Sequence, residues 1–343
     1  MVRGIAWSVC SLLLALVLPG QLRADPVADF YNGKTITMVV GYTAGGGYDL
    51  YARALARHMS KHIPGNPKFV VNNMPGAGSL TAANYLYGVA PKDGTVMGTI
   101  GRGLAMEPLI GKGNANFDAR KFTWLGSGTN EISVCVVSST SPVKTWEDVM
   151  TRQVSVGGEG SGSDPDTFAT LLKNLFGAKL QLVSGYPGGA EITLAIERGE
   201  VEGRCGWSLS AINATRPDWI PQNKLRFLLQ MSLDRNPELP DVPAVLEKAK
   251  TDREKQILKL VFSRQIMGRP FLAPPDVPED RKQALRKAFD ATMKDPEFLA
   301  QAKQIGLEVD PVTGADIDKL LGELYATPKE VLDQARAAIA GKM

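Results

Sequence analysis

The sequence has little of what most catalytic and metal sites require. Its 343 residues include only two histidines, His58 and His62, and three cysteines, Cys10, Cys135 and Cys205. Their number and spacing argue against a zinc site and against an enzyme that relies on histidine as acid and base. The sequence also has no nucleophile elbow, no Walker loop and no carboxylate array for a metal. We therefore predict a protein that is not an enzyme and that holds no cofactor or metal.

An excess of charge of one sign is also missing. The chain has 39 Lys and Arg against 36 Asp and Glu, a formal net charge of +3, and no basic block. Because a nucleic-acid surface needs a dense stripe of Lys and Arg, we expect no nucleic-acid partner. With 44% hydrophobic and 22% charged residues, the composition is ordinary for a folded globular chain and excludes a disordered or fibrous one.

Long hydrophobic runs are absent beyond the N-terminus. There, Arg3 precedes an apolar run over residues 5–18, and a small residue, Ala24, stands before Asp25. The run is shorter than the roughly 20 apolar residues of a spanning helix, and the layout is that of a secretory signal. We interpret residues 1–24 as a signal peptide and expect a periplasmic protein. The alternative is an uncleaved membrane anchor.

The mature chain is longer than one hydrophobic core comfortably supports, so we predict two domains. Domain 1 would take residues 25–127 and 230–343, and domain 2 residues 128–229. Only Cys135 and Cys205 remain after removal of the signal. The oxidising compartment permits a disulfide between them, but the sequence leaves open whether they are close.

Short apolar runs alternate with helical periodicity, which is typical of an α/β fold with parallel strands. We expect strands over residues 34–41, 68–72, 95–100, 132–137, 153–156, 179–183, 201–207 and 225–230. We expect helices over residues 48–62, 79–87, 146–150, 167–176, 190–198, 242–250, 252–260, 278–293, 296–305 and 314–341. The proline-rich stretch 269–278 should be extended.

Four glycine-rich segments stand directly before predicted helices, over residues 41–49, 73–79, 157–163 and 186–191. Glycine allows a close approach to the backbone, and a helix start offers free N–H groups and a positive dipole end to an anion. Ligands of α/β sheets bind at the carboxyl ends of the strands. The segments therefore predict a cleft that suits a small carboxylate. The alternative is that they are only tight turns.

Side chains beside these segments are further candidates: Tyr42, Tyr48, Asp49, Arg102, Tyr186, Arg204 and Trp207. Asp49 would either complement the dipole of its helix or contact the ligand. Arg102 would be a fork for a carboxylate or an ordinary surface residue. Arg204 would line a pocket with the neighbouring tryptophan or pair with Glu202. Tyr42 and Tyr48 would form a wall beside the ligand or cover the edge of the sheet.

Several segments resemble the extracytoplasmic receptors of the tripartite tricarboxylate transporter family, the Bug-type solute-binding proteins. They are YNGKTITMVVGYTAGGGYDLYARALA, NNMPGAGSLTAANYL, DGTVMGT, YPGGAE, GEVEGRCGWS and LPDVP. The resemblance covers nearly all of the mature chain. It implies a two-domain periplasmic-binding-protein type II fold, α/β in class, with the ligand cleft between the domains. It departs from the family at Tyr42-Thr43-Ala44, where members usually carry Pro-Phe.

The resemblance also implies site residues and partners. Backbone amides and ordered water would hold one carboxylate, at Thr43, Ala44, Gly46, Tyr48, Ala77, Gly78 and Ser79. Hydroxyls of the second domain would come from Ser161 and Ser163. The expected function is capture of a small organic carboxylate by a monomer that delivers it to the membrane permease subunits. The alternatives are a receptor that signals to a sensor kinase and, more remotely, an exported enzyme on an anionic substrate.

Overall fold

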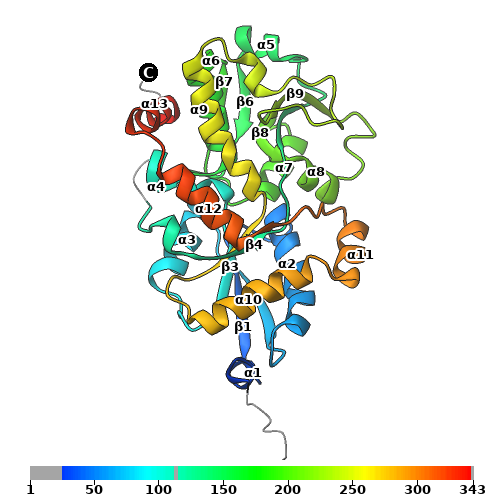
Figure 1. Cartoon of the computed structure of the whole chain (residues 1–343). Coiled ribbons are helices and arrows are strands. Elements are labelled where there is room, and N and C mark those ends of the chain that lie inside the picture. The colour runs from blue at the N-terminus through cyan, green and yellow to red at the C-terminus, as the bar shows by residue number, and fades with distance from the viewer. Residues whose placement is uncertain (1–24, 112–114, 341–343) are drawn as a thin grey trace, which may run out of the picture.

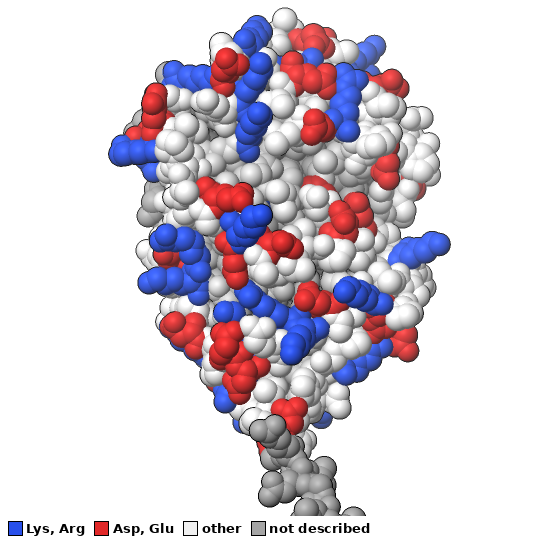
Figure 2. Space-filling model, viewed as in Figure 1, with Lys and Arg blue, Asp and Glu red and all other residues white. Residues whose placement is uncertain are grey.

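The computed structural model describes residues 25–111 and 115–340, so the predicted signal peptide lies outside the described residues. The chain forms two α/β lobes stacked one above the other, each built around its own sheet (Figure 1). None of the helices within the described ranges combines the length and apolarity that a membrane crossing requires. On the face in Figure 2, acidic and basic side chains are intermixed.

The first lobe contains a six-stranded sheet of order β11-β4-β10-β3-β1-β2. Strand β1 pairs in parallel with β2 and β3, whereas β10 runs antiparallel to β3 and β4. The strands are β1 (Thr35–Val40), β2 (Lys68–Asn73), β3 (Val96–Thr99), β4 (Thr123–Ser127), β10 (Pro270–Ala273) and β11 (Val312–Thr313).

The second lobe contains a five-stranded sheet of order β7-β6-β8-β5-β9. Strands β7, β6 and β8 are parallel, and β5 runs antiparallel to β8 and β9. The strands are β5 (Ser133–Ser138), β6 (Val154–Gly157), β7 (Leu180–Val183), β8 (Gly203–Ser208) and β9 (Leu225–Met231). A disulfide joins Cys135 on β5 to Cys205, its partner on β8, which answers the question that the sequence left open.

Helices cover both sheets (Figure 1). Around the first sheet lie α1 (Pro26–Tyr31), α2 (Gly47–Met59), α3 (Leu80–Gly88), α4 (Glu107–Ile110), α10 (Glu279–Thr292), α11 (Pro296–Gln304) and α12 (Gly314–Tyr325). Around the second lie α5 (Trp146–Thr151), α6 (Asp164–Phe176), α7 (Gly189–Glu197), α8 (Leu209–Thr215), α9 (Asp252–Phe262) and α13 (Lys329–Ala340). Short 3-10 turns include η1 (Ser60–His62), η2 (Ala77–Ser79), η3 (Arg102–Met106), η5 (Val245–Lys248) and η6 (Ser263–Met267).

Strand β1 illustrates how the apolar pattern builds the first core. Ile36, Met38 and Val40 alternate along the strand and are buried in one cluster with Leu55 of α2 and Phe289 of α10. Successive strand side chains point to opposite faces, so this spacing directs all three toward the same helices. Their burial fixes α2, and with it the glycine loop that precedes this helix, on the sheet.

Three expected elements differ from the structure. Residues 242–250 form only the turn η5, because α9 starts afresh at the capping box of Thr251 and Glu254. The helix expected over residues 314–341 is divided, within the described residues, into α12 and α13, because Pro328 lacks an N–H and restricts the residue before it. Helix α2 ends at Met59 and passes into η1 instead of continuing to residue 62.

The chain passes between the sheets at residues 128–132 and again before β10. Gly128 N donates to Arg269 O at 2.9 Å and Gly268 N donates to Thr129 O at 2.9 Å, so a short antiparallel ribbon joins the lobes. The expected domain limit at 229/230 falls inside β9, which belongs to the second sheet. Beyond it, α9 and α13 pack on α6 of the second lobe. The exact domain limits stay a prediction.

Candidate functional site

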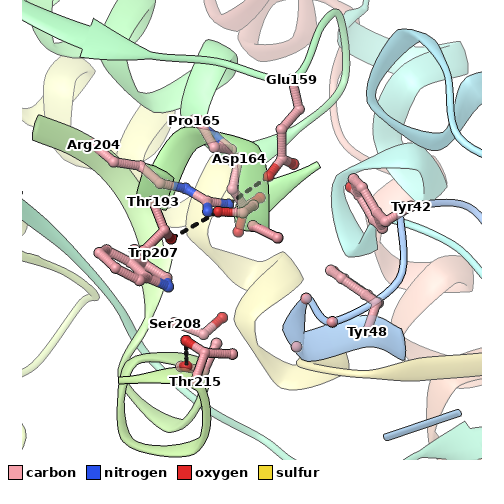
Figure 3. Close-up of a pocket in the computed structure, with 18 of the residues that line it drawn as sticks. Tyr42, Tyr48, Glu159, Asp164, Pro165, Thr193, Arg204, Trp207, Ser208 and Thr215 are labelled. Carbon is pink, nitrogen blue, oxygen red and sulfur yellow. Dashed lines mark hydrogen bonds and ion pairs between the residues drawn. The ribbon is translucent and has the colours of Figure 1, made fainter. Parts of the chain in front are cut away.

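A cavity lies between the two lobes and takes its lining from both (Figure 3). The first lobe supplies the start of α2 with its glycine loop, two tyrosines and two arginines: Tyr42, Gly45, Gly46, Gly47, Tyr48, Gly101, Arg102 and Arg269. The second lobe supplies α7, β8, α8 and the start of α6: Glu159, Asp164, Pro165, Gly189, Ala190, Thr193, Arg204, Gly206, Trp207, Ser208, Ala211, Thr215 and Arg216.

In the first lobe, α2 begins at the cavity without a side-chain cap. Its N-cap is Gly46, which has no side chain to satisfy the free N–H groups of the first turn. Arg269 is 2% exposed, and a Cβ atom added at Gly47 would lie 3.1 Å from its Nη2. A glycine at the first helical position therefore lets a buried guanidinium approach the positive end of the helix.

Arg269 is held by the residues around it. Its Nη1 lies 2.7 Å from Glu131 Oε1, and its guanidinium lies 4.7 Å from the ring centre of Tyr48. Burial is the largest single influence and acts to lower the pKa of Arg269, but Glu131, Tyr48, Tyr51 and Asp164 together outweigh it, so the pKa is raised. The Nε atom is buried without a hydrogen-bond partner in the described parts of the chain. The sequence analysis missed Arg269. The only hint that the sequence offers is that this charged residue stands in an otherwise apolar segment.

Asp49 supports the glycine loop from behind and does not line the cavity. Its carboxylate accepts hydrogen bonds from Gly45 N, Arg53 Nε and Asn73 Nδ2, each at 2.9 Å. Burial acts to raise the pKa of Asp49, but these hydrogen bonds outweigh it, so the pKa is lowered. Asp49 therefore holds the backbone of the loop, in addition to its favourable place in the first turn of α2.

The second lobe has the same arrangement. Helix α7 begins at Gly189 after the uncapped Gly188, and a Cβ atom added at Gly189 would lie 2.5 Å from Arg204 Nη1. Arg204 Nη2 lies 2.6 Å from Glu159 Oε1. Burial raises the pKa of Glu159, while the attraction of Arg204 opposes that rise.

Of the two alternatives for Arg204, the pairing with Glu202 is wrong. Glu202 accepts hydrogen bonds from Ser141 Oγ at 2.9 Å and from Ser155 N at 3.0 Å, so its carboxylate is engaged at the start of β8. The other alternative was that Arg204 lines a pocket together with Trp207, and both residues do line the cavity. Figure 3 shows Arg204, Glu159 and Trp207 on one side of the cavity and Tyr42 and Tyr48 on the other.

Arg102 joins the lobes at the back of the cavity and is not a surface residue. Its Nε lies 2.6 Å from Asp164 Oδ2, its Nη1 donates to Glu131 O at 3.2 Å, and its Nη2 donates to Ser133 Oγ. Arg264 Nη1 lies 3.5 Å from the other oxygen of Asp164. The guanidinium of Arg102 is thus engaged by the protein itself, and Asp164 lies between two arginines.

The lobes also touch beside the cavity, through the other predicted loops. Thr43 Oγ1 donates to Glu191 Oε2 at 2.7 Å, and a Cβ atom added at Gly78 would lie 2.8 Å from Ser161 O. Ala77 and Ser79 have φ angles of 47° and 77°, a left-handed conformation that costs non-glycine residues about 1–3 kcal/mol each. This loop is therefore a strained segment at the contact between the lobes.

Two serines that were expected near the ligand have other partners. Ser79 stands directly before α3 but does not cap this helix with its side chain. Its Oγ instead accepts a hydrogen bond from Gly101 N at 3.2 Å. Ser163 caps α6, since its Oγ accepts from Asp166 N at 3.4 Å.

The predicted residues thus fall into two groups. Lining the cavity are Tyr42, Gly46, Tyr48, Arg102, Arg204 and Trp207. Outside its lining are Thr43, Ala44, Asp49, Ala77, Gly78, Ser79, Ser161, Ser163 and Tyr186. The ligand-binding roles of both groups stay predictions. The sequence analysis also missed Asp164 and Glu159, and the latter stands out as the only charged residue of its glycine loop.

The histidines lie far from this cavity, at the end of α2. His58 Nε2 lies 2.8 Å from Gln301 Oε1, and His62 Nε2 lies 2.8 Å from Asp295 Oδ2. Lys61 Nζ lies 2.6 Å from both Asp295 and Glu297, so one ammonium group is shared by these two carboxylates.

Two α/β lobes joined by crossing segments around a polar cavity define the two-domain periplasmic-binding-protein fold. Similar solved structures include the periplasmic binding protein BugD, with a TM-score of 0.69, 22% identity, and coverage of 89% of this chain and 98% of that one. Another is R. palustris Rpa4515 with adipate, with a TM-score of 0.68, 21% identity, and coverage of 88% and 97%. MatC from Rhodopseudomonas palustris with bound malate has a TM-score of 0.67, 19% identity, and coverage of 87% and 99%.

Sequence comparison gives the family. Residues 51–336 match the family described as "Tripartite tricarboxylate transporter family receptor". The UPF0065 protein in the gbd 5' region of Cupriavidus necator is 27% identical over 350 residues, which cover 98% of this chain and 97% of the relative. The chain belongs to the tripartite tricarboxylate transporter receptor family and is a periplasmic solute-binding receptor.

Proposed function

We propose that this receptor captures a small organic carboxylate in the cavity between its lobes and delivers it to the membrane permease subunits of a tripartite carboxylate transporter. One observation carries the proposal: the uncapped start of α2 faces the cavity with the buried guanidinium of Arg269 against Gly47. A helix N-terminus and an arginine fork are each suited to an anion, and here they converge on one point.

The carboxylate would accept hydrogen bonds from the free backbone N–H groups at Gly46, Gly47 and Tyr48 and from Arg269 Nε, which is buried without a partner in the described chain. Tyr42 and Tyr48, whose rings stack at 4.7 Å, would form the adjoining wall. Burial raises the pKa of both tyrosines, so they stay neutral and do not repel an acid. Exclusion of water between the lobes would strengthen each contact.

No chemical step is needed for this function. Binding would shift the receptor toward the arrangement in which both lobes surround the acid. The family and the similar structures are those of binding proteins, which supports a receptor rather than an enzyme. The malate and adipate of two similar structures belong to those proteins and are sensible first members of a test panel.

Isothermal titration calorimetry with a panel of small organic acids tests capture. We expect at least one acid to bind and to be recovered unchanged. Gly47→Ala should weaken that binding about tenfold or more, because its Cβ would crowd both Ala211 Cβ at 3.0 Å and Arg269 Nη2 at 3.1 Å. The matched control is Gly322→Ala on α12, where an added Cβ meets nothing within 4 Å.

Binding of none of the acids would overturn the proposal, and equal affinity in Gly47→Ala and the control would remove α2 from the site. Delivery is tested separately, by uptake of the labelled acid through reconstituted permease subunits. Uptake that does not depend on the receptor would overturn that part. Light scattering of the purified receptor checks the expected monomer.

A further inference from the structure

The second lobe carries an anion anchor that matches the one in the first lobe. Helix α7 starts without a side-chain cap at Gly188, and Arg204 lies against Gly189, its first residue. Arg204 is 8% exposed and lines the cavity, yet its Nε has no hydrogen-bond partner in the described chain. A buried donor with no partner is unfavourable unless a ligand satisfies it.

Arginines already lie against the carboxylates in this part of the cavity, whereas several donors are left over. One oxygen of Glu159 lies 2.6 Å from Arg204, and the oxygens of Asp164 lie 2.6 Å from Arg102 and 3.5 Å from Arg264. The lining carboxylates are therefore already engaged by arginines. The first turn of α7, the Nε of Arg204 and the indole nitrogen of Trp207, which faces the cavity in Figure 3, remain as donors.

Taken with the proposed function, on which this inference rests, we propose that Arg204 with the start of α7 selects acids that carry a second anionic group. The first carboxylate lies at α2 and Arg269, and the second anion lies at α7 and Arg204. Glu159 positions the guanidinium by holding its Nη2, which leaves the Nε edge of Arg204 for the ligand. An ammonium group of a ligand at this end would face the guanidinium of Arg204 and the positive end of α7, which repel it.

Calorimetry with matched probes tests this selectivity. The diacids are succinate, glutarate and adipate, each compared with the monoacid of equal length, butyrate, valerate or hexanoate. We expect the best diacid to bind about tenfold or more tightly than its monoacid, the effect of one charged hydrogen-bonded contact. Glutamate, which adds an ammonium to glutarate, should bind more weakly than glutarate.

The variant that tests the residues is Glu159→Gln/Arg204→Gln, which replaces the buried ion pair by a neutral pair able to hydrogen-bond and so avoids an unpaired buried charge. The ratio of diacid to monoacid affinity should fall toward one. Glu131→Gln/Arg269→Gln is the matched control at the other anchor, and it should weaken diacid and monoacid alike. Gly189→Ala, whose Cβ displaces only the end of Arg204, should lower the ratio even if the double variant does not fold.

The outcomes separate the two proposals. Diacids and monoacids that bind the wild type equally well would overturn selection by Arg204 but leave capture of a carboxylate standing. Tighter binding of glutamate than of glutarate would do the same. Binding of neither class would overturn the proposed function itself.

Discussion

Arg102 and Asp164 form a buried ion pair across the boundary between the lobes, with Nε and Oδ2 2.6 Å apart. Arg102 follows β3 in the first lobe, and Asp164 is the first residue of α6 in the second lobe. Because Arg264 approaches the other oxygen of Asp164, one carboxylate compensates two buried arginines. The contact ties the back of the cavity to both lobes.

Asp164→Asn should therefore be strongly destabilising, since it leaves two buried arginines without their carboxylate. We expect a loss of about 3–5 kcal/mol in the free energy of unfolding, measured by urea denaturation. Asp218→Asn is the control, because Asp218 forms an exposed pair with Lys224 and its loss should cost far less stability. Equal losses in the two variants would contradict the role given to Asp164.

The disulfide should stabilise the second lobe. Cys135 and Cys205 are 70 residues apart in sequence, and the entropy of a closed loop of that length corresponds to roughly 4 kcal/mol. We expect Cys135→Ala/Cys205→Ala to lower the free energy of unfolding by about that amount. Urea denaturation of wild type with and without reductant provides the comparison. A double variant as stable as the oxidised wild type would refute the prediction.

Asp295 should make the protein sensitive to acid. Hydrogen bonds from Lys61, His62 and the backbone of Glu297, the largest from Lys61, hold the pKa of Asp295 far below its ordinary value of 3.8. A carboxyl whose pKa is lowered by folding adds stability above its unfolded pKa, and this stability is lost as pH falls below about 4.

Asp295→Asn keeps an oxygen that can cap α11 but removes the titrating group. Its thermal midpoint should fall less steeply between about pH 6 and about pH 3 than that of the wild type. Parallel slopes in the two proteins would show that another group governs the acid limit.

Whether Asp49→Asn weakens or tightens binding of the acid distinguishes two roles for Asp49. If it holds the glycine loop through Gly45 N, Asp49→Asn should weaken binding of the acid several-fold, the effect of losing one hydrogen bond worth about 1 kcal/mol. If it lay beside the bound acid and repelled it, the same change would tighten binding. We expect weakening, measured by calorimetry, because Asp49 does not line the cavity.

The sequence predicted most strands and helices because their apolar periodicity is local. It missed β4, whose TWLGS segment lacks an alternating pattern and is held by antiparallel pairing with β10 and β11. It placed the glycine loops at helix starts because the glycine clusters stand directly before segments of helical periodicity. It missed Arg269 and Glu159, because their partners, Glu131 and Arg204, are remote in the chain and only tertiary folding brings them together.

The ribbon that joins the lobes has a kinetic consequence for capture. Its two main-chain hydrogen bonds pair Gly128 with Arg269 and Gly268 with Thr129, so the strands of the ribbon pivot together rather than slide past one another. Arg269 lies on this ribbon, whereas Arg204 lies on β8 of the second lobe, so a movement of the lobes apart would carry Arg204 away from α2 while Arg269 stays beside it. We expect an arriving acid to dock at α2 first, on an anchor that hardly moves, and to be locked in when Arg204 returns.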